Sequence, residues 1–204
     1  MNKRCILIGA GEMKEKNISL EKNDFVIAVD GGYQYCLNLN IHPDLVVSDF
    51  DSYPHEIKGI EILRSQPEKD DTDMMLAILA GLERGYDEFV IYGGMGGRLE
   101  HTLGNIQCLN FLCQKKAHGI MISQNSRVEV LGKGSRSYDA SMSGYISIFS
   151  LADESVISIE NLKYSLDHKR ISNATTLGVD NEFIGKESKI TLHEGCICIV
   201  ITEG

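Results

Sequence analysis

Residues 25–52 read FVIAVDGGYQYCLNLNIHPDLVVSDFDS, and this stretch decides the fold. Two β-branched apolar runs, FVIAV (25–29) and DLVVS (44–48), flank a segment of helical character at 32–39. Two parallel strands need a long crossover of this kind, because a tight hairpin joins only antiparallel strands. The stretch therefore predicts a strand–helix–strand unit of a parallel sheet.

The same alternation extends from residue 3 to about residue 123. Strands are predicted at 4–9, 88–93 and 119–123, with a further short strand at 61–64. Helices are predicted at 73–84 and 99–115, and the first of these begins after Thr72 as N-cap and ends at Gly85 as the C′ residue. Strands that alternate with helices predict a mostly parallel sheet with helices on both faces.

The pattern changes after about residue 127, where no long helical segment remains. Short alternating runs separated by Gly, Ser, Asn and Asp favour an antiparallel sandwich, and they lie at 145–151, 156–162, 188–192 and 196–201. A polar connection is expected at 124–135. We predict an α/β domain over 1–126, followed by a smaller all-β sandwich domain over 127–204.

Composition excludes several classes of protein. The chain has 204 residues and is 43% hydrophobic and 24% charged, which is typical of a globular protein. Its net charge of −9 has the wrong sign for binding nucleic acid through phosphates. The six cysteines form no CxxC pair, and no apolar run approaches the ~20 residues that span a bilayer. We expect a soluble, cytoplasmic protein with buried, reduced cysteines and without nucleic-acid or membrane partners.

Aspartates are placed at the predicted ends of strands and at the start of a helix, all on one edge of the sheet: Asp30, Asp49, Asp51, Asp70 and Asp73. The carboxyl ends of parallel strands converge on one crevice, where ligands bind. Carboxylates gathered there repel one another unless cations neutralise them, and oxygen ligands of this kind favour Mg²⁺. A single aspartate is more often a turn or N-cap residue than a metal ligand, so the joint occurrence carries the prediction of a metal site.

A glycine-rich segment, GGMGGRLEHTLGN (93–105), follows the predicted strand at 88–93 and enters a helix. Glycines allow close backbone approach to a ligand, and the helix N-terminus favours phosphate. Arg98 offers a planar fork of donors for phosphate oxygens. His101 is placed either to contact phosphate or to bond within its own helical turn. Gly31 and Gly32, after Asp30, offer a second point of close approach.

One rival interpretation comes from GAGEMK (9–14), which follows the first strand and resembles part of a dinucleotide fingerprint. Lys14 occupies the place of the third glycine, and the polar sequence that follows lacks helical periodicity. A nicotinamide or flavin enzyme is therefore disfavoured, and the two glycines are expected to turn the chain near a nucleotide.

Taken together, these motifs resemble the thiamine pyrophosphokinase family over nearly the whole chain. The matching segments are AVDGG (28–32), PDLVVSDFDS (43–52), KDDTDMMLAI (69–78), GGMGGRLEHTLGN (93–105) and, more loosely, LKYSL (162–166) and VDNEF (179–183). The resemblance implies a catalytic α/β domain, a thiamine-binding β-sandwich domain and a homodimer with sites at the subunit interface. It also implies Mg²⁺-dependent transfer of pyrophosphate from ATP to thiamine, with release of AMP.

The resemblance also implies roles for individual residues. The acidic nucleotide and metal site would comprise Asp30, Asp49, Asp51, Asp70, Thr72 and Asp73, with Mg²⁺ held by Asp49, Asp51 and Asp73. The phosphate loop would comprise Gly93, Gly94, Gly96, Gly97, Arg98 and Asn105. Asp180 and Asn181 lie in the segment that would recognise the thiamine pyrimidine.

Four positions depart from the family pattern, which usually has Gly at Ser48, Asp at Glu100, Pro at Ser165 and Ser at Asp180. Glu100 adds one methylene beside the phosphate loop, and Asp180 places a carboxylate where a hydroxyl is usual. Two alternatives stay open: a pyrophosphokinase for another small alcohol, such as a hydroxymethyl pterin, and a nucleotide sensor without turnover.

Overall fold

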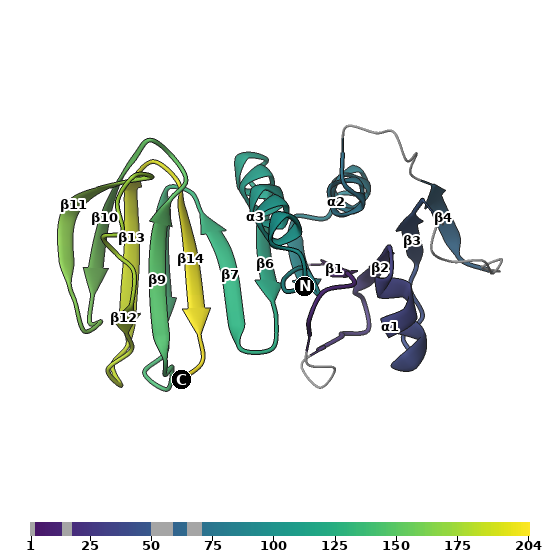
Figure 1. Ribbon diagram of the computed structural model, residues 1–204, viewed down its shortest axis with the longest axis horizontal. Helices are drawn as coiled ribbons and strands as arrows, with labels where there is room; N and C mark the ends of the chain where they lie inside the picture. Colours follow the sequence, from purple (N-terminus) through teal and green to yellow (C-terminus); the bar gives the residue numbers. More distant parts are fainter. Residues whose placement is uncertain (1–2, 14–17, 50–58, 65–70) are drawn as a thin grey trace. The chain divides into compact units, whose positions relative to one another are not determined.

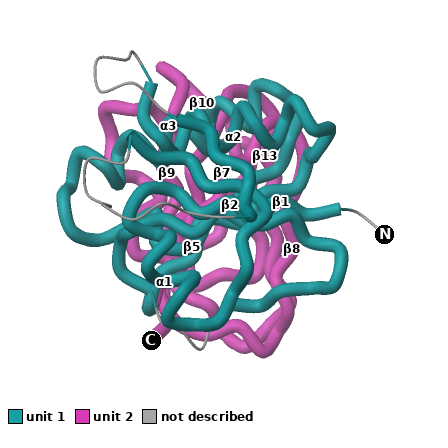
Figure 2. The backbone as a smooth tube through the Cα atoms, turned by 90° about the vertical axis from the view of Figure 1, so that its right-hand side faces the viewer, with its two compact units in different colours: residues 1–124 teal, residues 125–204 magenta. Residues whose placement is uncertain are grey.

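The computed structural model describes residues 3–13, 18–49, 59–64 and 71–204 (Figure 1). The chain divides into two compact units, residues 1–124 and 125–204, which Figure 2 distinguishes by colour. Within the described residues, every helix is too short or too polar to cross a bilayer. Asp51 and Asp70, two of the predicted site residues, lie outside the described residues.

The first unit contains a parallel sheet in the strand order β6-β5-β1-β2-β3-β4, and every neighbouring pair is parallel. Its strands are β1 (Arg4–Ile8), β2 (Phe25–Val29), β3 (Leu45–Ser48), β4 (Glu61–Arg64), β5 (Glu88–Tyr92) and β6 (His118–Ile122). Each corresponds to a run predicted from sequence. β1, β2 and β3 are almost wholly buried, as expected for parallel strands covered on both faces.

Three helices cover this sheet. α1 (Gly32–Asn38) lies against β1 and β2 on one face, while α2 (Asp73–Glu83) and α3 (Leu99–Gln114) lie on the other (Figure 1). The Thr72 side chain accepts a hydrogen bond from the Met75 N–H at 3.2 Å, and Gly85 has a left-handed φ of 82° after the last turn of α2. Both predicted ends of this helix are confirmed, and so is the placement of helices on both faces.

The second unit is an antiparallel sandwich, as predicted. One group of strands runs in the order β12-β9-β14-β7, comprising β7 (Ser126–Leu131), β9 (Tyr145–Ser150), β12 (Asn181–Glu182) and β14 (Ile197–Thr202). The other runs β11-β10-β13-β8, comprising β8 (Gly134–Tyr138), β10 (Glu154–Glu160), β11 (Leu166–Ser172) and β13 (Ser188–Glu194). Their inward isoleucines and leucines form one apolar core, which includes Ile146, Ile159, Ile190 and Ile199.

The prediction of a polar connection at 124–135 is wrong, because β7 and the start of β8 occupy this segment. Val128 and Val130 of β7 are buried beside β14. Glu129 lies between them and is only 1% exposed, yet it has partners: Arg136 Nε lies 3.0 Å from Oε2, and the Tyr138 hydroxyl donates to Oε1 at 3.1 Å. A charge that is paired by the neighbouring strand can lie inside a sheet.

Buried cysteines were also predicted, and Cys5, Cys36, Cys108 and Cys198 are buried. All six cysteines lie in the described residues, and none of them forms a disulfide. Burial raises the pKa of the Cys5 thiol to about 12, despite the Arg84 guanidinium, which acts in the opposite direction. Such thiols behave as small apolar side chains, which agrees with their expected structural role.

Candidate active site

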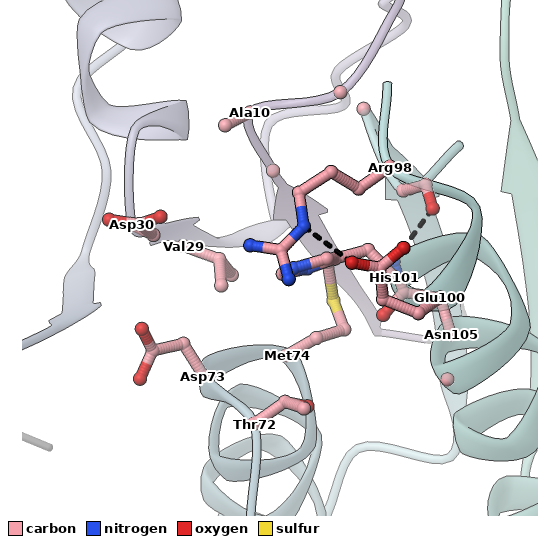
Figure 3. Close-up of a pocket in the computed structure, with 15 residues that line it drawn as sticks. Ala10, Val29, Asp30, Thr72, Asp73, Met74, Arg98, Glu100, His101 and Asn105 are labelled. Carbon is pink, nitrogen blue, oxygen red and sulfur yellow. Dashed lines mark hydrogen bonds and ion pairs between the residues drawn. The ribbon is translucent and has the colours of Figure 1, made fainter. Parts of the chain in front are cut away.

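A cavity of about 460 Å³ opens in the first unit, where the carboxyl ends of β1, β2 and β5 meet the N-termini of α2 and α3 (Figure 3). Its lining consists of Gly9, Ala10, Gly11, Val29, Asp30, Thr72, Asp73, Met74, Gly93, Gly94, Arg98, Glu100, His101, Gly104 and Asn105. This is the edge of a parallel sheet at which ligands generally bind.

Two glycine turns form the floor of the cavity and pair with each other. The Gly11 N–H donates to the Gly93 carbonyl and the Glu12 N–H to the Met95 carbonyl, each at 2.8 Å. These bonds continue the β1–β5 pairing beyond the ends of the strands. A Cβ atom on Gly11 would lie 2.3 Å from the Met95 carbonyl oxygen, so the turns approach this closely only without a side chain there.

Charges of opposite sign line opposite sides of the cavity. The carboxylates of Asp30 and Asp73 lie on one side, and the guanidinium of Arg98 extends toward them from the other (Figure 3). Asp30 has a left-handed φ of 50°, an uncommon conformation that aspartate tolerates better than most residues. Backbone strain of this kind is frequent at functional sites.

The α3 N-terminus supplies both cationic and amide groups. Arg98 is the N-cap residue, with an extended backbone and no side-chain capping bond, and Glu100 lies in the first helical turn. Arg98 Nε donates to Glu100 Oε1 at 2.6 Å. One turn further along, Asn105 Nδ2 donates to the Gly94 carbonyl at 2.7 Å and fixes the glycine turn to α3. The helix N-terminus is thereby held beside the cavity, where its positive partial charge favours an anionic ligand.

The structure gathers eight of the sequence-predicted residues in this lining: Asp30, Thr72, Asp73, Gly93, Gly94, Arg98, His101 and Asn105. Five others in the first unit are described but do not line the cavity: Gly31, Gly32, Asp49, Gly96 and Gly97. Gly32 has a packing reason, since a Cβ atom there would lie 1.8 Å from the Ile8 carbonyl oxygen. Among the described residues, no three His, Cys, Asp or Glu side chains are arranged to hold one metal ion.

Sequence reasoning did not select Gly9, Ala10 and Gly11 as site residues. Their signal was the GAG turn directly after β1, which had been considered for a different cofactor. Val29, Met74 and Gly104 were also missed, because apolar residues and a helical glycine carry no chemical signature in a sequence.

Asp180 and Asn181 belong to the second unit. Asn181 is only 3% exposed, and its amide is committed to backbone groups: Oδ1 accepts from the Tyr164 N–H at 2.9 Å, and Nδ2 donates to the Tyr164 carbonyl at 2.7 Å. Asp180 is exposed, with a left-handed φ of 58°. Asn181 thus fixes the segment that presents Tyr164, whose side chain is exposed.

The second unit also holds a more open cavity of about 590 Å³ beside β10, β11 and β13. The rings of His168 and His193 stack there with centroids 4.0 Å apart, and Ser158 Oγ lies 2.9 Å from His193 Nε2. None of the site residues predicted from sequence lines this cavity.

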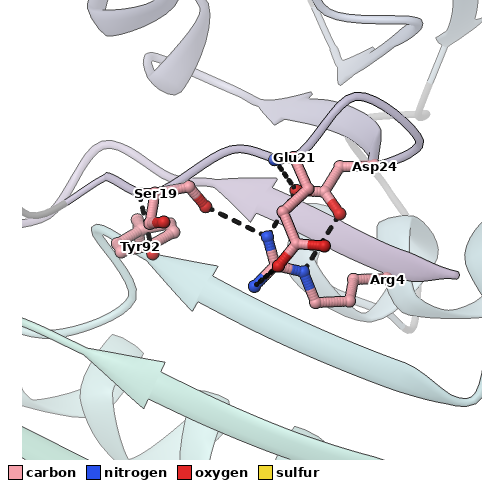
Figure 4. Close-up of polar contacts among 5 residues, drawn as sticks. All are labelled: Arg4, Ser19, Glu21, Asp24 and Tyr92. Carbon is pink, nitrogen blue, oxygen red and sulfur yellow. Dashed lines mark hydrogen bonds and ion pairs between the residues drawn. The ribbon is translucent and has the colours of Figure 1, made fainter. Parts of the chain in front are cut away.

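The amino ends of the unit 1 strands carry a different kind of polar cluster (Figure 4). Arg4, at the start of β1, donates from Nε and Nη2 to the two carboxylate oxygens of Asp24, at 3.0 and 2.6 Å. The Glu21 N–H donates to the same carboxylate at 2.7 Å. Burial would raise the pKa of Asp24, but the bonds from Arg4 and Glu21 outweigh it and hold this pKa below its ordinary value. We call these three residues the Arg4 clamp.

The fold and the cavity together define an α/β protein with a site suited to a phosphorylated ligand. Residues 17–122 match the family model "Thiamin pyrophosphokinase, catalytic domain", and residues 135–197 match "Thiamin pyrophosphokinase, vitamin B1 binding domain". The chain belongs to the thiamin pyrophosphokinase family.

Individual relatives agree with this assignment. The thiamine pyrophosphokinase of Bacillus subtilis is 29% identical over 182 residues, which cover 85% of each chain. A crystal structure of a Bacillus subtilis thiamine pyrophosphokinase superposes with a TM-score of 0.90 at 23% identity, covering 99% of this chain and 100% of that one. The Candida albicans enzyme has a TM-score of 0.77 at 18% identity, covering 99% and 90%. None of these matches supports the pterin or sensor alternatives.

Proposed function

We propose that this protein transfers pyrophosphate from ATP to the hydroxyl group of thiamine and releases thiamine diphosphate and AMP. The proposal rests on one observation: the chain that matches this family also has a cavity whose lining suits the family's reaction. The cavity combines glycine turns, a helix N-terminus and Arg98 on one side with carboxylates on the other. Such a site suits a polyphosphate accompanied by a cation.

We assign ATP binding and catalysis to residues 1–126 and thiamine binding to residues 127–204. The vitamin B1 binding match over 135–197 supports the second assignment. The segment of Asp180 and Asn181 would recognise the thiamine pyrimidine. Because the Asn181 amide already bonds to the Tyr164 backbone, its contribution would be to position Tyr164 for the ring.

The reaction requires in-line attack at the β-phosphorus. The thiamine oxygen forms a bond to this phosphorus, the bond from the β-phosphorus to the α,β-bridging oxygen breaks, and AMP departs with that oxygen. Catalysis of this kind depends mainly on positioning and electrostatics. Arg98, His101 and the amides of the Gly93–Gly94 turn would hold the polyphosphate and offset its developing charge. Asp73 or Asp70 would accept the hydroxyl proton.

Mg²⁺ suits the donors present, since Asp30 and Asp73 offer carboxylate oxygens on the acidic side of the cavity. Asp49, Asp51 and Asp73 would hold the ion. When bound, Mg²⁺ would neutralise phosphate charge.

The proposed metal role predicts that Asp49→Asn and Asp51→Asn abolish Mg²⁺-dependent turnover. Unchanged turnover in both variants would remove the metal assignment.

We further propose a homodimer. Five apolar side chains of the second unit are 37–47% exposed: Tyr145, Phe149, Leu177, Val179 and Ile184. β9 carries the first two, and the segment of Leu177 and Val179 bonds to it, since the Ile148 N–H donates to the Gly178 carbonyl at 2.9 Å. We call these five residues the β9 patch. Exposed apolar patches mark interfaces. The lack of disulfides among the six described cysteines further suggests a cytoplasmic location.

The direct test is incubation of the purified protein with ATP, Mg²⁺ and thiamine, followed by chromatography of nucleotides and thiamine esters. We expect AMP and thiamine diphosphate in equal amounts. Parallel incubation with a hydroxymethyl pterin provides the acceptor control. AMP formed only with the pterin, or tight ATP binding with no AMP from either acceptor, would contradict the proposal.

A further inference from the structure

Arg98 and Glu100 form an ion pair at the mouth of the cavity, and both line it. Helical residues two positions apart do not normally face each other. The contact forms here because Arg98 is the N-cap residue, with φ −75° and ψ 125°, while Glu100 lies in the first turn of α3. The contact therefore depends on the backbone conformation where the loop enters α3.

Stability does not account for this pair. The side chains of Arg98 and Glu100 are 72% and 64% exposed. Ion pairs between exposed side chains contribute little or nothing measurable to folding. We therefore consider what the pair does for the cavity that both residues line.

The pair leaves the phosphate-binding part of the guanidinium available. Glu100 engages Nε, while Nη1 and Nη2 of Arg98 have no hydrogen-bond partner in the described part of the chain. These two groups form one edge of the planar fork, which matches two oxygens of a phosphate. Figure 3 shows the guanidinium extended over the cavity toward the side of Asp30 and Asp73.

Glu100 is itself fixed and charged. Its pKa lies below the ordinary value of a glutamate, first because its own backbone N–H donates to the carboxylate and second because Arg98 donates to it. An anion in the first turn is also stabilised by the helix dipole. A fixed carboxylate can restrict the rotation of a long arginine side chain, which otherwise loses much conformational freedom on binding.

We propose that Glu100 is a positioning residue, which holds Arg98 by Nε so that Nη1 and Nη2 face the polyphosphate of ATP. The inference rests on the proposed function and extends it to a residue that does not itself contact the reacting atoms. It also gives a reason for an acidic residue two positions after the arginine.

The test compares Glu100→Ala and Glu100→Asp with the wild type, by measuring AMP formation against ATP concentration at saturating thiamine and Mg²⁺. We expect Glu100→Ala to raise the KM for ATP about three-fold, the range open to an exposed pair, with the KM for thiamine, measured at saturating ATP, unchanged. Glu100→Asp keeps the charge and should restore most of the affinity. In an Arg98→Gln background, Glu100→Ala should have no further effect, because its partner is already absent.

A matched control is Glu154→Ala, which breaks the exposed Arg170–Glu154 pair of the second unit, with side chains 62% and 56% exposed. We expect the KM for ATP and the thermal midpoint to stay unchanged. A lower KM for ATP in Glu100→Ala would mean that the carboxylate competes with phosphate, and an unchanged KM would mean that it is idle; either result overturns the proposal.

Failure of the proposed function can be told apart from failure of this inference. If the wild type produces no AMP with thiamine, the function is wrong, and calorimetric titration with ATP then tests the positioning role by the dissociation constants alone. An equal dissociation constant for wild type and Glu100→Ala would reject it.

Discussion

Asn105 lies within α3, yet its side chain bonds outside the helix, to the Gly94 carbonyl. The residue therefore holds one glycine turn in place without contributing charge. In the proposed phosphate loop, this bond would fix the backbone of a turn that is to hold phosphate through its amides.

Asn105→Ala should consequently weaken ATP binding as well as the fold. Loss of one partly buried hydrogen bond costs about 1 kcal/mol of unfolding free energy. We expect a several-fold increase in the KM for ATP, measured by steady-state AMP formation. Asn38→Ala removes a comparable amide from the exposed Gln34–Asn38 pair and should change neither quantity. Equal effects of the two substitutions would contradict the role given to Asn105.

The Arg4 clamp makes stability depend on pH. The Asp24 side chain is only 4% exposed, and its pKa is held below the ordinary value. A carboxyl group of this kind stabilises the fold above its unfolded-state pKa of about 4, and the contribution is lost as the pH falls through the lower folded-state value.

Arg4→Met should cost about 2 kcal/mol of unfolding free energy at pH 7, because it leaves a buried carboxylate without its cation. The difference from the wild type should shrink progressively as the pH falls below about 4. Urea unfolding at pH 7, 5, 4 and 3 measures this difference. A constant difference across the series would show that the charge of Asp24 contributes nothing.

At the scale of elements, the two paired glycine turns at the ends of β1 and β5 have no room for a side chain at Gly9, Gly11 or Gly93. Gly11→Ala places a methyl group against the Met95 carbonyl and should cost about 2 kcal/mol. Gly104→Ala is the matched substitution within α3, where a Cβ atom meets nothing within 4 Å, and it should stabilise by about 0.5–1 kcal/mol. Thermal unfolding of both variants checks the opposite signs.

The elements that sequence predicted correctly are those with a strong local pattern. β1, β2 and β3 are β-branched and buried on both faces, so their apolar runs are continuous. β11 was missed because LDHKRIS is polar, and only Ile171 in it is buried. β7 was missed because Arg127 and Glu129 interrupt its valines. The partners of Glu129 on β8, Arg136 and Tyr138, become evident only when β8 lies beside β7.

The residues of the candidate site also divide into those with a local sequence signal and those without one. Asp30, Asp73 and the Gly93 turn were predicted because strand-end aspartates and glycine clusters are local signals that topology brings to one edge. Gly9 and Gly11 were expected only to turn the chain near a nucleotide. The bond from Gly11 to the Gly93 carbonyl was not predicted, because it joins turns more than eighty residues apart. The Arg98–Glu100 contact depends on backbone dihedral angles at a helix start, which sequence spacing does not reveal.

At the scale of the whole molecule, the β9 patch predicts association between copies. Phe149→Glu places a charge within this surface and should convert the proposed dimer to a monomer, as measured by light scattering coupled to size-exclusion chromatography. Leu37→Glu changes an exposed leucine of α1 in the first unit and serves as the control. A monomeric wild type would contradict the dimer proposal.

The first unit separates its two polar clusters by the direction of its strands. The cavity residues follow the carboxyl ends of β1, β2 and β5. Arg4 and Asp24 lie instead at the amino ends of β1 and β2. Glu88 and His118 pair at the amino ends of β5 and β6, with 3.0 Å between Oε2 and Nδ1. Thermal robustness and turnover are thus adjustable through different residues. Substitutions at the amino edge can raise thermal stability, while the carboxyl edge stays free to change toward other acceptors.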